Sequence, residues 1–135
     1  MSERPAIVLA EDSPADVYLF QEALRAHDVE AELVVFHDGE EAMSYLLTGE
    51  GHDPARLLFV LDLNLPKIDG LTLLKQLRST ARFAHSLVIV LTSSENPADR
   101  TESLRLGATR FIRKATDVTD FLDIGREIKL MLRGS

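Results

Sequence analysis

Residues 57–70 read LLFVLDLNLPKIDG, and this stretch decides the fold. Five apolar residues run without interruption into Asp62, which is typical of a parallel strand covered on both faces. The segment that follows Asp62 is rich in Asn, Pro, Asp and Gly, which favour a loop and then the start of a helix. A carboxylate therefore stands where a buried strand ends, and its position needs a physical explanation.

Four further short runs alternate with segments of helical period. Apolar residues fill positions 6–10, 33–36 and 87–91, and a more charged run covers 110–114. Helix-start signals lie between the runs, namely Ser13-Pro14 with Asp16, Asp38 with Glu41, and Asn96-Pro97. The alternation predicts an α/β fold, a doubly wound five-stranded parallel sheet with five helices.

The charges on the strands predict their places in the sheet. AIVLA at 6–10, LLFVL at 57–61 and LVIVL at 87–91 carry no charge, so we expect these three strands at the centre. AELVVF at 31–36 and RFIRK at 110–114 then suit the edges. The segment TGEGHDP at 48–54 predicts a surface loop.

Two helices are distinctive in their apolar pattern. The last one is expected as a single helix over about 118–132, with one apolar face formed by Phe121, Leu122, Ile128 and Leu132. The fourth, over about 97–106, is the least apolar and offers the core mainly Ala98, Leu104 and Leu106. Weakly anchored elements move most easily, so this helix is a candidate for the part that moves.

The composition restricts the class of protein. We expect residues 1–135 to form a single domain, because this length suits one core and about three residues follow the last helix. A hydrophobic content of 45% and a charged content of 27% indicate a globular chain, not one that spans a membrane. The net charge of -7 repels a phosphate backbone, which argues against nucleic-acid binding.

The sequence indicates neither disulfides nor export. It contains no cysteine, which excludes a disulfide, a thiolate metal site and a cysteine nucleophile. The first apolar run, at 6–10, is far shorter than the core of a signal peptide and is followed at once by two acids. We therefore predict a cytoplasmic protein.

Charged and polar residues terminate the predicted strands. Glu11 and Asp12 follow the first, Asp62 the third, Thr92 the fourth and Lys114 the fifth. Ligand sites in open parallel sheets lie at this end of the strands. Two carboxylates about 4 Å apart repel by roughly 4 kcal/mol at an effective dielectric of ~20, so a divalent cation such as Mg²⁺ is the better account of the cluster.

This arrangement predicts phosphoryl transfer. Such a transfer needs in-line placement of the reactants and neutralisation of the phosphoryl oxygens, which a cation and Lys114 would supply. Asp62 is the natural acceptor because it lies in the middle of the acidic positions, on the central strand. The alternative is a Mg²⁺-dependent phosphohydrolase that turns over with Asp62 as nucleophile, and a third class is an interaction domain that does not use phosphorylation.

Four motifs resemble the response-regulator receiver domain of bacterial two-component signalling. They are EDSP at 11–14, DLNLPKIDG at 62–70, TSSE at 92–95 and FIRK at 111–114. Their order at successive strand ends is specific, and the resemblance covers nearly the whole chain. It implies a flavodoxin-like sheet of order 2-1-3-4-5 and a signalling protein, not an enzyme. EDSPADV at 11–17 further resembles stand-alone regulators paired with bacterial phytochromes.

The resemblance also implies a role for each acidic residue. Asp62 would accept a phosphoryl group from a histidine kinase. Asp12 and Asp62 would bind Mg²⁺ directly, Glu11 would help through water, and Asn64 would contribute its backbone carbonyl.

Four more roles follow from the resemblance. Thr92 would hydrogen-bond the phosphoryl group, and Lys114 would pair with it. Phe111 would swing inward on activation, and Ser94 with Asn64 would modulate dephosphorylation. The signal would leave through the surface formed by the fourth helix, fifth strand and fifth helix. The implied partners are a sensor histidine kinase such as a bacterial phytochrome, a phosphotransfer protein, or a second copy of the chain.

One residue departs from the family pattern. The family usually follows its lysine with a proline in a cis peptide, and here Ala115 follows Lys114. A cis bond before a non-proline residue costs about 3 kcal/mol, so either the bond is trans or the site imposes strain.

Other polar residues have structural interpretations. Asp16 most simply completes a capping box with Ser13, and Asp69 with Gly70 forms a turn and helix start. The four histidines lack metal-ligand spacing and are interpreted as surface residues.

Overall fold

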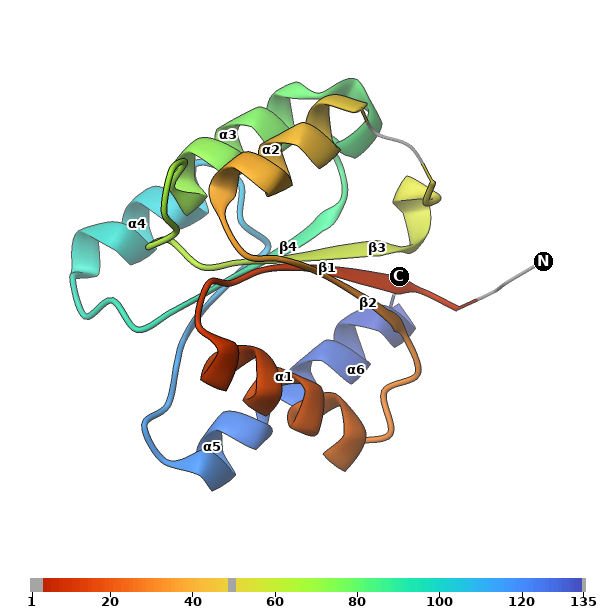
Figure 1. Ribbon diagram of the computed structural model, residues 1–135, viewed down its shortest axis with the longest axis vertical. Coiled ribbons are helices and arrows are strands. Elements are labelled where there is room, and N and C mark those ends of the chain that lie inside the picture. The colour runs from red at the N-terminus through yellow and green to blue at the C-terminus, as the bar shows by residue number, and fades with distance from the viewer. Residues whose placement is uncertain (1–3, 49–50, 135) are drawn as a thin grey trace.

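A computed structural model describes residues 4–48 and 51–134 and contains a five-stranded parallel sheet (Figure 1). The strand order is β2-β1-β3-β4-β5, which confirms the predicted topology. Residues 49–50 of the predicted surface loop lie outside the described part. The strands are β1 Ala6–Ala10, β2 Glu32–Phe36, β3 Leu57–Leu61, β4 Leu87–Thr92 and β5 Arg110–Arg113.

Helices cover both faces of the sheet (Figure 1). One face carries α1 Pro14–Ala26, α5 Val118–Leu122 and α6 Ile124–Gly134. The other carries α2 Gly39–Thr48, α3 Gly70–Ser79 and α4 Pro97–Arg105. Short 3₁₀ turns, η1 Pro54–Arg56 and η2 Ala81–Phe83, precede β3 and β4. Within the described ranges, none of these helices is long and apolar enough to cross a membrane.

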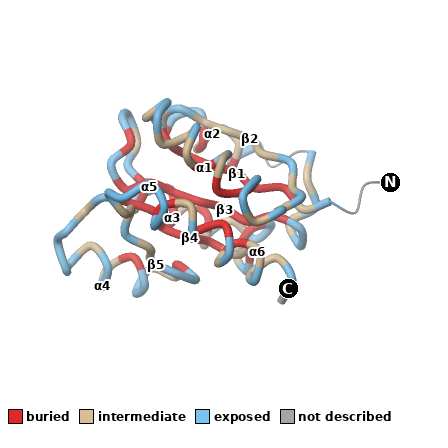
Figure 2. The backbone as a smooth tube through the Cα atoms, turned by 90° about the horizontal axis from the view of Figure 1, so that it is seen from below, coloured by how far each residue is buried: buried red, intermediate tan, exposed pale blue. Residues whose placement is uncertain are grey.

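The burial of the strands follows the charge pattern of the sequence. Every residue of β1 and β3 is buried, as is every residue of β4 after the first (Figure 2). The edge strands β2 and β5 contain no fully buried residue. The three apolar runs therefore occupy the centre as predicted, because a central strand has a helical layer on each side.

The last helical segment is broken, contrary to the expectation of one helix. Asp123 lies between α5 and α6, and its N–H donates to the Asp120 carbonyl at 3.2 Å. The Arg126 N–H donates to the Asp123 carbonyl at 3.0 Å. Both bonds join residues three apart, as in a 3₁₀-helix, and interrupt the α-helical hydrogen-bond pattern. A Cβ on Gly125 would lie 2.2 Å from the Ala23 carbonyl oxygen, so α6 begins in close contact with α1. The break permits this close packing.

The orientation of α4 also differs from the expectation. Leu104 is 41% exposed and Ala98 is exposed, so only Leu106 of the three expected residues packs against the core. The residue that α4 buries is Ser103, at 0% exposure. A small polar side chain therefore faces inward, and the helix gains little hydrophobic stabilisation.

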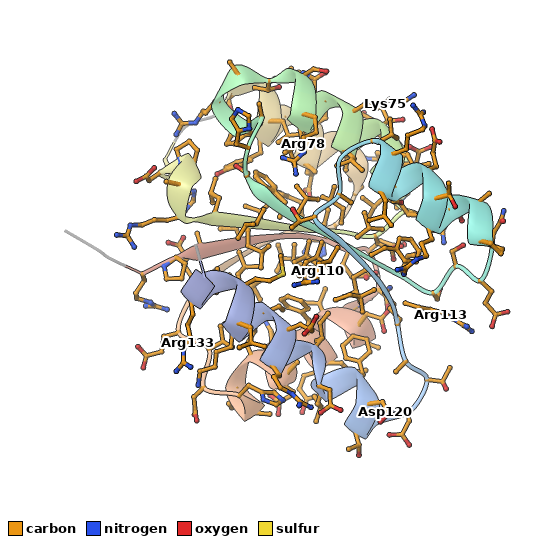
Figure 3. The ribbon with its side chains drawn as sticks, turned by 180° about the vertical axis from the view of Figure 1, so that it is seen from behind. Lys75, Arg78, Arg110, Arg113, Asp120 and Arg133 are labelled. Atoms are coloured by element: carbon orange, nitrogen blue, oxygen red, sulfur yellow. The ribbon has the colours of Figure 1, made fainter. Side chains whose placement is uncertain are left out.

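Arg78 joins the end of α3 to the segment that follows α4. Its side chain extends from α3 toward the sheet (Figure 3) and donates to the Gly107 carbonyl from Nε at 3.0 Å and from Nη2 at 2.8 Å. Its Nη1 donates to the Ser86 carbonyl at 2.7 Å and to the Ala84 carbonyl at 3.1 Å. One guanidinium thus fixes the turn at the carboxyl end of α4.

Candidate functional site

The register of the sheet places the strand-end acids side by side. Leu61 of β3 pairs with Ala10 of β1, so the next residues, Asp62 and Glu11, emerge at the same rim. The Asp62 N–H donates to the Ala10 carbonyl at 3.1 Å, and the Glu11 N–H donates to the Phe36 carbonyl at 2.9 Å. The parallel ladder therefore continues one residue beyond the strands and fixes both backbones.

Three carboxylates meet at this rim. Oxygen atoms of Glu11, Asp12 and Asp62 all lie within 4.8 Å of one another. Glu11 and Asp62 are 2% and 6% exposed, whereas Asp12 faces solvent. An all-oxygen donor set with one open side suits a hard divalent cation that keeps several waters. The residues present therefore fit a magnesium-type site.

The ammonium group of Lys114 lies beside the acids. Its Nζ is 2.7 Å from Glu11 Oε1, 2.8 Å from Asp16 Oδ2 and 2.9 Å from Asp62 Oδ2, and its side chain is 8% exposed. Burial alone would lower the pKa of Lys114, but the three carboxylate contacts outweigh burial and raise it. Lys114 is therefore fully charged.

One lysine does not balance this acidic cluster. Four carboxylates, on Glu11, Asp12, Asp16 and Asp62, stand against one ammonium, which leaves three net negative charges when all are ionised. Burial raises the pKa of Glu11, the bond from Lys114 lowers it and the Asp62 charge raises it again, with a net value of about 6. The excess negative charge favours a cation at the three clustered carboxylates.

Asp16 belongs to this site, which corrects its interpretation as a capping residue only. Ser13 does cap α1, because its Oγ accepts from the Asp16 N–H at 3.3 Å. The Ser13 N–H, however, donates to Glu11 Oε2 at 3.1 Å and leaves no donor for the Asp16 carboxylate. Asp16 instead contacts Lys114. A signal was present in the sequence, because a side chain in the first helical turn points back toward the strand ends.

The loop after β4 connects Thr92 to α4. Thr92 is fully buried, its carbonyl accepts from the Lys114 N–H at 2.8 Å, and its Oγ accepts from the Ser94 N–H at 3.4 Å. The Ser94 hydroxyl donates to Asp99 in the first turn of α4 and accepts from the Asn96 N–H at 3.2 Å. A chain of hydrogen bonds thus runs from the site to the start of α4.

Phe111 lies on β5 and is half-buried. Its ring packs on the core of the α2 and α3 face, and the guanidinium carbon of Arg100 lies 5.8 Å from the ring centroid. Arg113 of β5 also forms an ion pair with Glu95, which lies in the loop before α4. Beside Phe111, the contacts made by α4 and the loop before it thus come from charged side chains, Arg100 and Glu95.

The loop after β3 holds Asn64 and the start of α3. The Asn64 N–H donates to Asp62 Oδ1 at 3.0 Å. Asp69 caps α3 by accepting from the Thr72 N–H at 2.9 Å, as predicted. A Cβ on Gly70 would lie 2.3 Å from the Asp62 carbonyl oxygen, so only glycine permits α3 to begin against the backbone of Asp62.

Two other expectations are resolved by the structure. The described peptide bonds include no cis bond, so the bond between Lys114 and Ala115 is trans. His52 is not a plain surface residue, because its ring contacts the Tyr45 hydroxyl at 3.0 Å and Glu32 Oε2 at 3.3 Å.

The sequence of the chain matches a known protein family. The response regulator receiver domain family matches residues 7–125. The chain belongs to this family. It is a receiver domain of two-component signalling, and the comparison supports the resemblance drawn from the four motifs.

Individual relatives agree with this assignment. The chain is 35% identical to the response regulator Rcp1 of Synechocystis sp. over 91% of this chain and 85% of the relative. It also resembles the crystal structure of the phosphorylated cyanobacterial phytochrome response regulator RcpA, with 34% identity, a TM-score of 0.84, and coverage of 96% and 94% of the two chains. The Mn²⁺-bound form of Rcp1 is similar, with 32% identity, a TM-score of 0.82, and coverage of 93% and 91%.

Proposed function

We propose that the receiver domain accepts a phosphoryl group on Asp62 from the phosphohistidine of a histidine kinase. One observation carries the proposal: the Asp62 carboxylate is buried at the rim of the sheet, between two clustered acids and the ammonium of Lys114. Carboxylates that fit a cation and an ammonium group beside the acceptor would neutralise the charge of a phosphoryl group. A relative, RcpA, is described in phosphorylated form.

The proposed reaction moves the phosphoryl group from a histidine nitrogen to a carboxylate oxygen of Asp62. An oxygen of Asp62 forms a bond to phosphorus while the bond from phosphorus to the histidine nitrogen breaks, and the electron pair stays on the imidazole. Lys114 neutralises one phosphoryl oxygen, and the Thr92 hydroxyl donates to another. Asp62 is held for attack because its N–H and Oδ1 are both fixed by backbone partners.

Mg²⁺ is the proposed cofactor. Glu11, Asp12 and Asp62 would hold it with their carboxylates, together with the backbone carbonyl of Asn64. When bound, it supplies positive charge to the phosphoryl oxygens. The geometric fit of the three carboxylates and the Mn²⁺-bound form of a relative support a divalent cation here.

The proposed output is a change of surface. Thr92, drawn toward the phosphoryl group, would pull on Ser94 and the first turn of α4, and Phe111 would move inward. The partners we propose are a sensor histidine kinase of the phytochrome type, a phosphotransfer protein, or a second copy of the chain at α4, β5 and α5. The name of the relative RcpA, a phytochrome response regulator, supports this kinase class. Residues 1–135 would act in the cytoplasm as one domain and signal by association.

Incubation with acetyl phosphate and Mg²⁺, followed by intact mass spectrometry, tests the proposal. We expect an increase of about 80 Da for the added phosphoryl group, its loss in Asp62→Asn, and its retention in Asp69→Asn, which changes an exposed acid of the same loop. An adduct that persists in Asp62→Asn would contradict the assignment. Release of phosphate over many turnovers from small esters would instead indicate the phosphohydrolase.

A further inference from the structure

All three N–H donors of Lys114 are already used. Glu11, Asp16 and Asp62 each accept from Nζ at 2.7 to 2.9 Å. A lysine ammonium has three donors and no more, so a phosphoryl oxygen can be contacted only when one carboxylate gives up its bond. The carboxylate that keeps its bond to Lys114 determines where Nζ lies during the reaction.

Of the three carboxylates that contact Lys114, Asp16 is the one that neither belongs to the cation cluster nor accepts the phosphoryl group. Glu11 and Asp62 belong to the three carboxylates within 4.8 Å of one another, and Asp62 also receives the phosphoryl group in the proposed function. The Asp16 carboxylate is not a member of that group. Its side chain is 29% exposed, and its only described hydrogen-bond partner is Lys114. It can therefore keep its contact with Lys114 in both states.

The backbone of Asp16 is fixed independently of Lys114. Its N–H donates to Ser13 Oγ at the cap of α1, so the carboxylate projects from the rigid first turn of a helix. The lysine is less constrained. The Lys114 N–H is held by the Thr92 carbonyl, but four rotatable bonds separate that anchor from Nζ. A fixed acid thus faces a flexible cation.

We propose that Asp16 is a positioning residue that holds Lys114 Nζ beside Asp62 for phosphoryl transfer. The inference rests on the proposed function and names a fourth acid for that site. Asp16 does not touch the reacting atoms. It acts by keeping the ammonium within hydrogen-bond distance of the acceptor carboxylate while Glu11 and Asp62 change partners.

The kinetic test compares Asp16→Ala and Asp16→Asn with the wild-type protein under acetyl phosphate, at a Mg²⁺ concentration that saturates each protein. We expect Asp16→Ala to gain phosphate about tenfold more slowly, because misplacing a positioned group by about 1 Å can lower the rate by up to about a hundredfold. Asp16→Asn removes the same charge but keeps an oxygen acceptor, so it should recover most of the rate. Equal rates for the Ala and Asn variants, or an unchanged rate for Ala, would overturn the proposal.

Asp120→Ala is the matched control. Asp120 stands third after its cap residue Asp117, as Asp16 does after Ser13, and its N–H bonds to the cap at 3.2 Å. It lies on α5 (Figure 3), and Lys114 is not among its described partners. The same loss of charge at the same helical position should leave the rate at the wild-type value. A tenfold loss in this control would mean that charge alone explains the effect.

A direct readout of Lys114 separates positioning from folding. In ¹⁵N-labelled protein the hydrogen-bonded Nζ of Lys114 should give a protected ammonium signal, assigned by its loss in Lys114→Arg. We expect fast exchange of this signal in Asp16→Ala, recovery in Asp16→Asn, and no change in Asp120→Ala. An unaltered signal in Asp16→Ala would overturn the inference while Asp62 still gained phosphate, whereas a wild-type protein that gains no phosphate would defeat the proposed function itself.

Discussion

The helices α3 and α4 cover the same face of the sheet and both begin at the rim that carries Asp62, yet they are anchored in opposite ways. α3 buries Leu73, Leu74 and Leu77 at 0% exposure. α4 buries Ser103 and leaves Leu104 41% exposed. The hydrophobic effect thus stabilises the position of α3 far more than that of α4.

The difference assigns separate tasks to the two helices. α3 begins against the backbone of Asp62, where Gly70 permits close contact, so we propose that α3 holds the acceptor in place. α4 is tied at its start to Ser94 through Asp99 and at its far end to Arg78 through Gly107. A helix held by polar contacts at its two ends can shift when one of them is pulled, and this makes α4 the better transmitter.

The largest contrast should appear on truncating one leucine in each helix. Leu74→Ala leaves a cavity in the core and should lower the free energy of unfolding by about 2–5 kcal/mol. Leu104→Ala removes an exposed side chain from the surface of α4 and should change the free energy of unfolding by less than about 0.5 kcal/mol. Urea denaturation followed by circular dichroism measures both. Similar losses for the two variants would contradict the difference in hydrophobic anchoring between α3 and α4.

Removal of the Arg78 guanidinium should have an intermediate effect. In Arg78→Met the carbonyls of Gly107 and Ser86 lose their charged donor, so stability should fall by about 1–3 kcal/mol. Hydrogen exchange should rise in residues 97–108 more than in α3. A rise confined to α3 would show that Arg78 does not hold α4.

The smallest effect is expected at Ser103. Among the described residues it is the one whose buried side-chain oxygen has no hydrogen-bond partner. Ser103→Ala removes the cost of that group, so stability should stay equal or rise by up to about 1 kcal/mol. Thermal and urea unfolding would reveal it. A loss above 1 kcal/mol would mean that the hydroxyl is bonded in solution.

Sequence alone predicted the sheet because burial on both faces leaves a clear pattern. The three uncharged runs form the central strands β1, β3 and β4. The charged runs at 31–36 and 110–114 form the edge strands β2 and β5. The places of the acids at the rim followed from the same register, since a parallel ladder aligns the strand ends.

The misses have a common physical cause. Capping patterns describe one helix, whereas the partner of Asp16 depends on which N–H groups Glu11 has already taken. The break at Asp123 depends on how closely α6 packs on α1. The inward face of α4 was misjudged because a weak apolar pattern does not fix the rotation of a helix. Long-range packing decides each of these points.

The central claim is that a phosphoryl group on Asp62 moves α4 while α3 keeps the acceptor in place. Backbone amide spectra recorded before and after acetyl phosphate with Mg²⁺ test it most directly. We predict large shifts for residues 93–106 and 110–114, small shifts for residues 71–79, and none in Asp62→Asn. Shifts in α3 as large as those in α4, or a phosphorylated protein with an unchanged spectrum for α4, would contradict the claim.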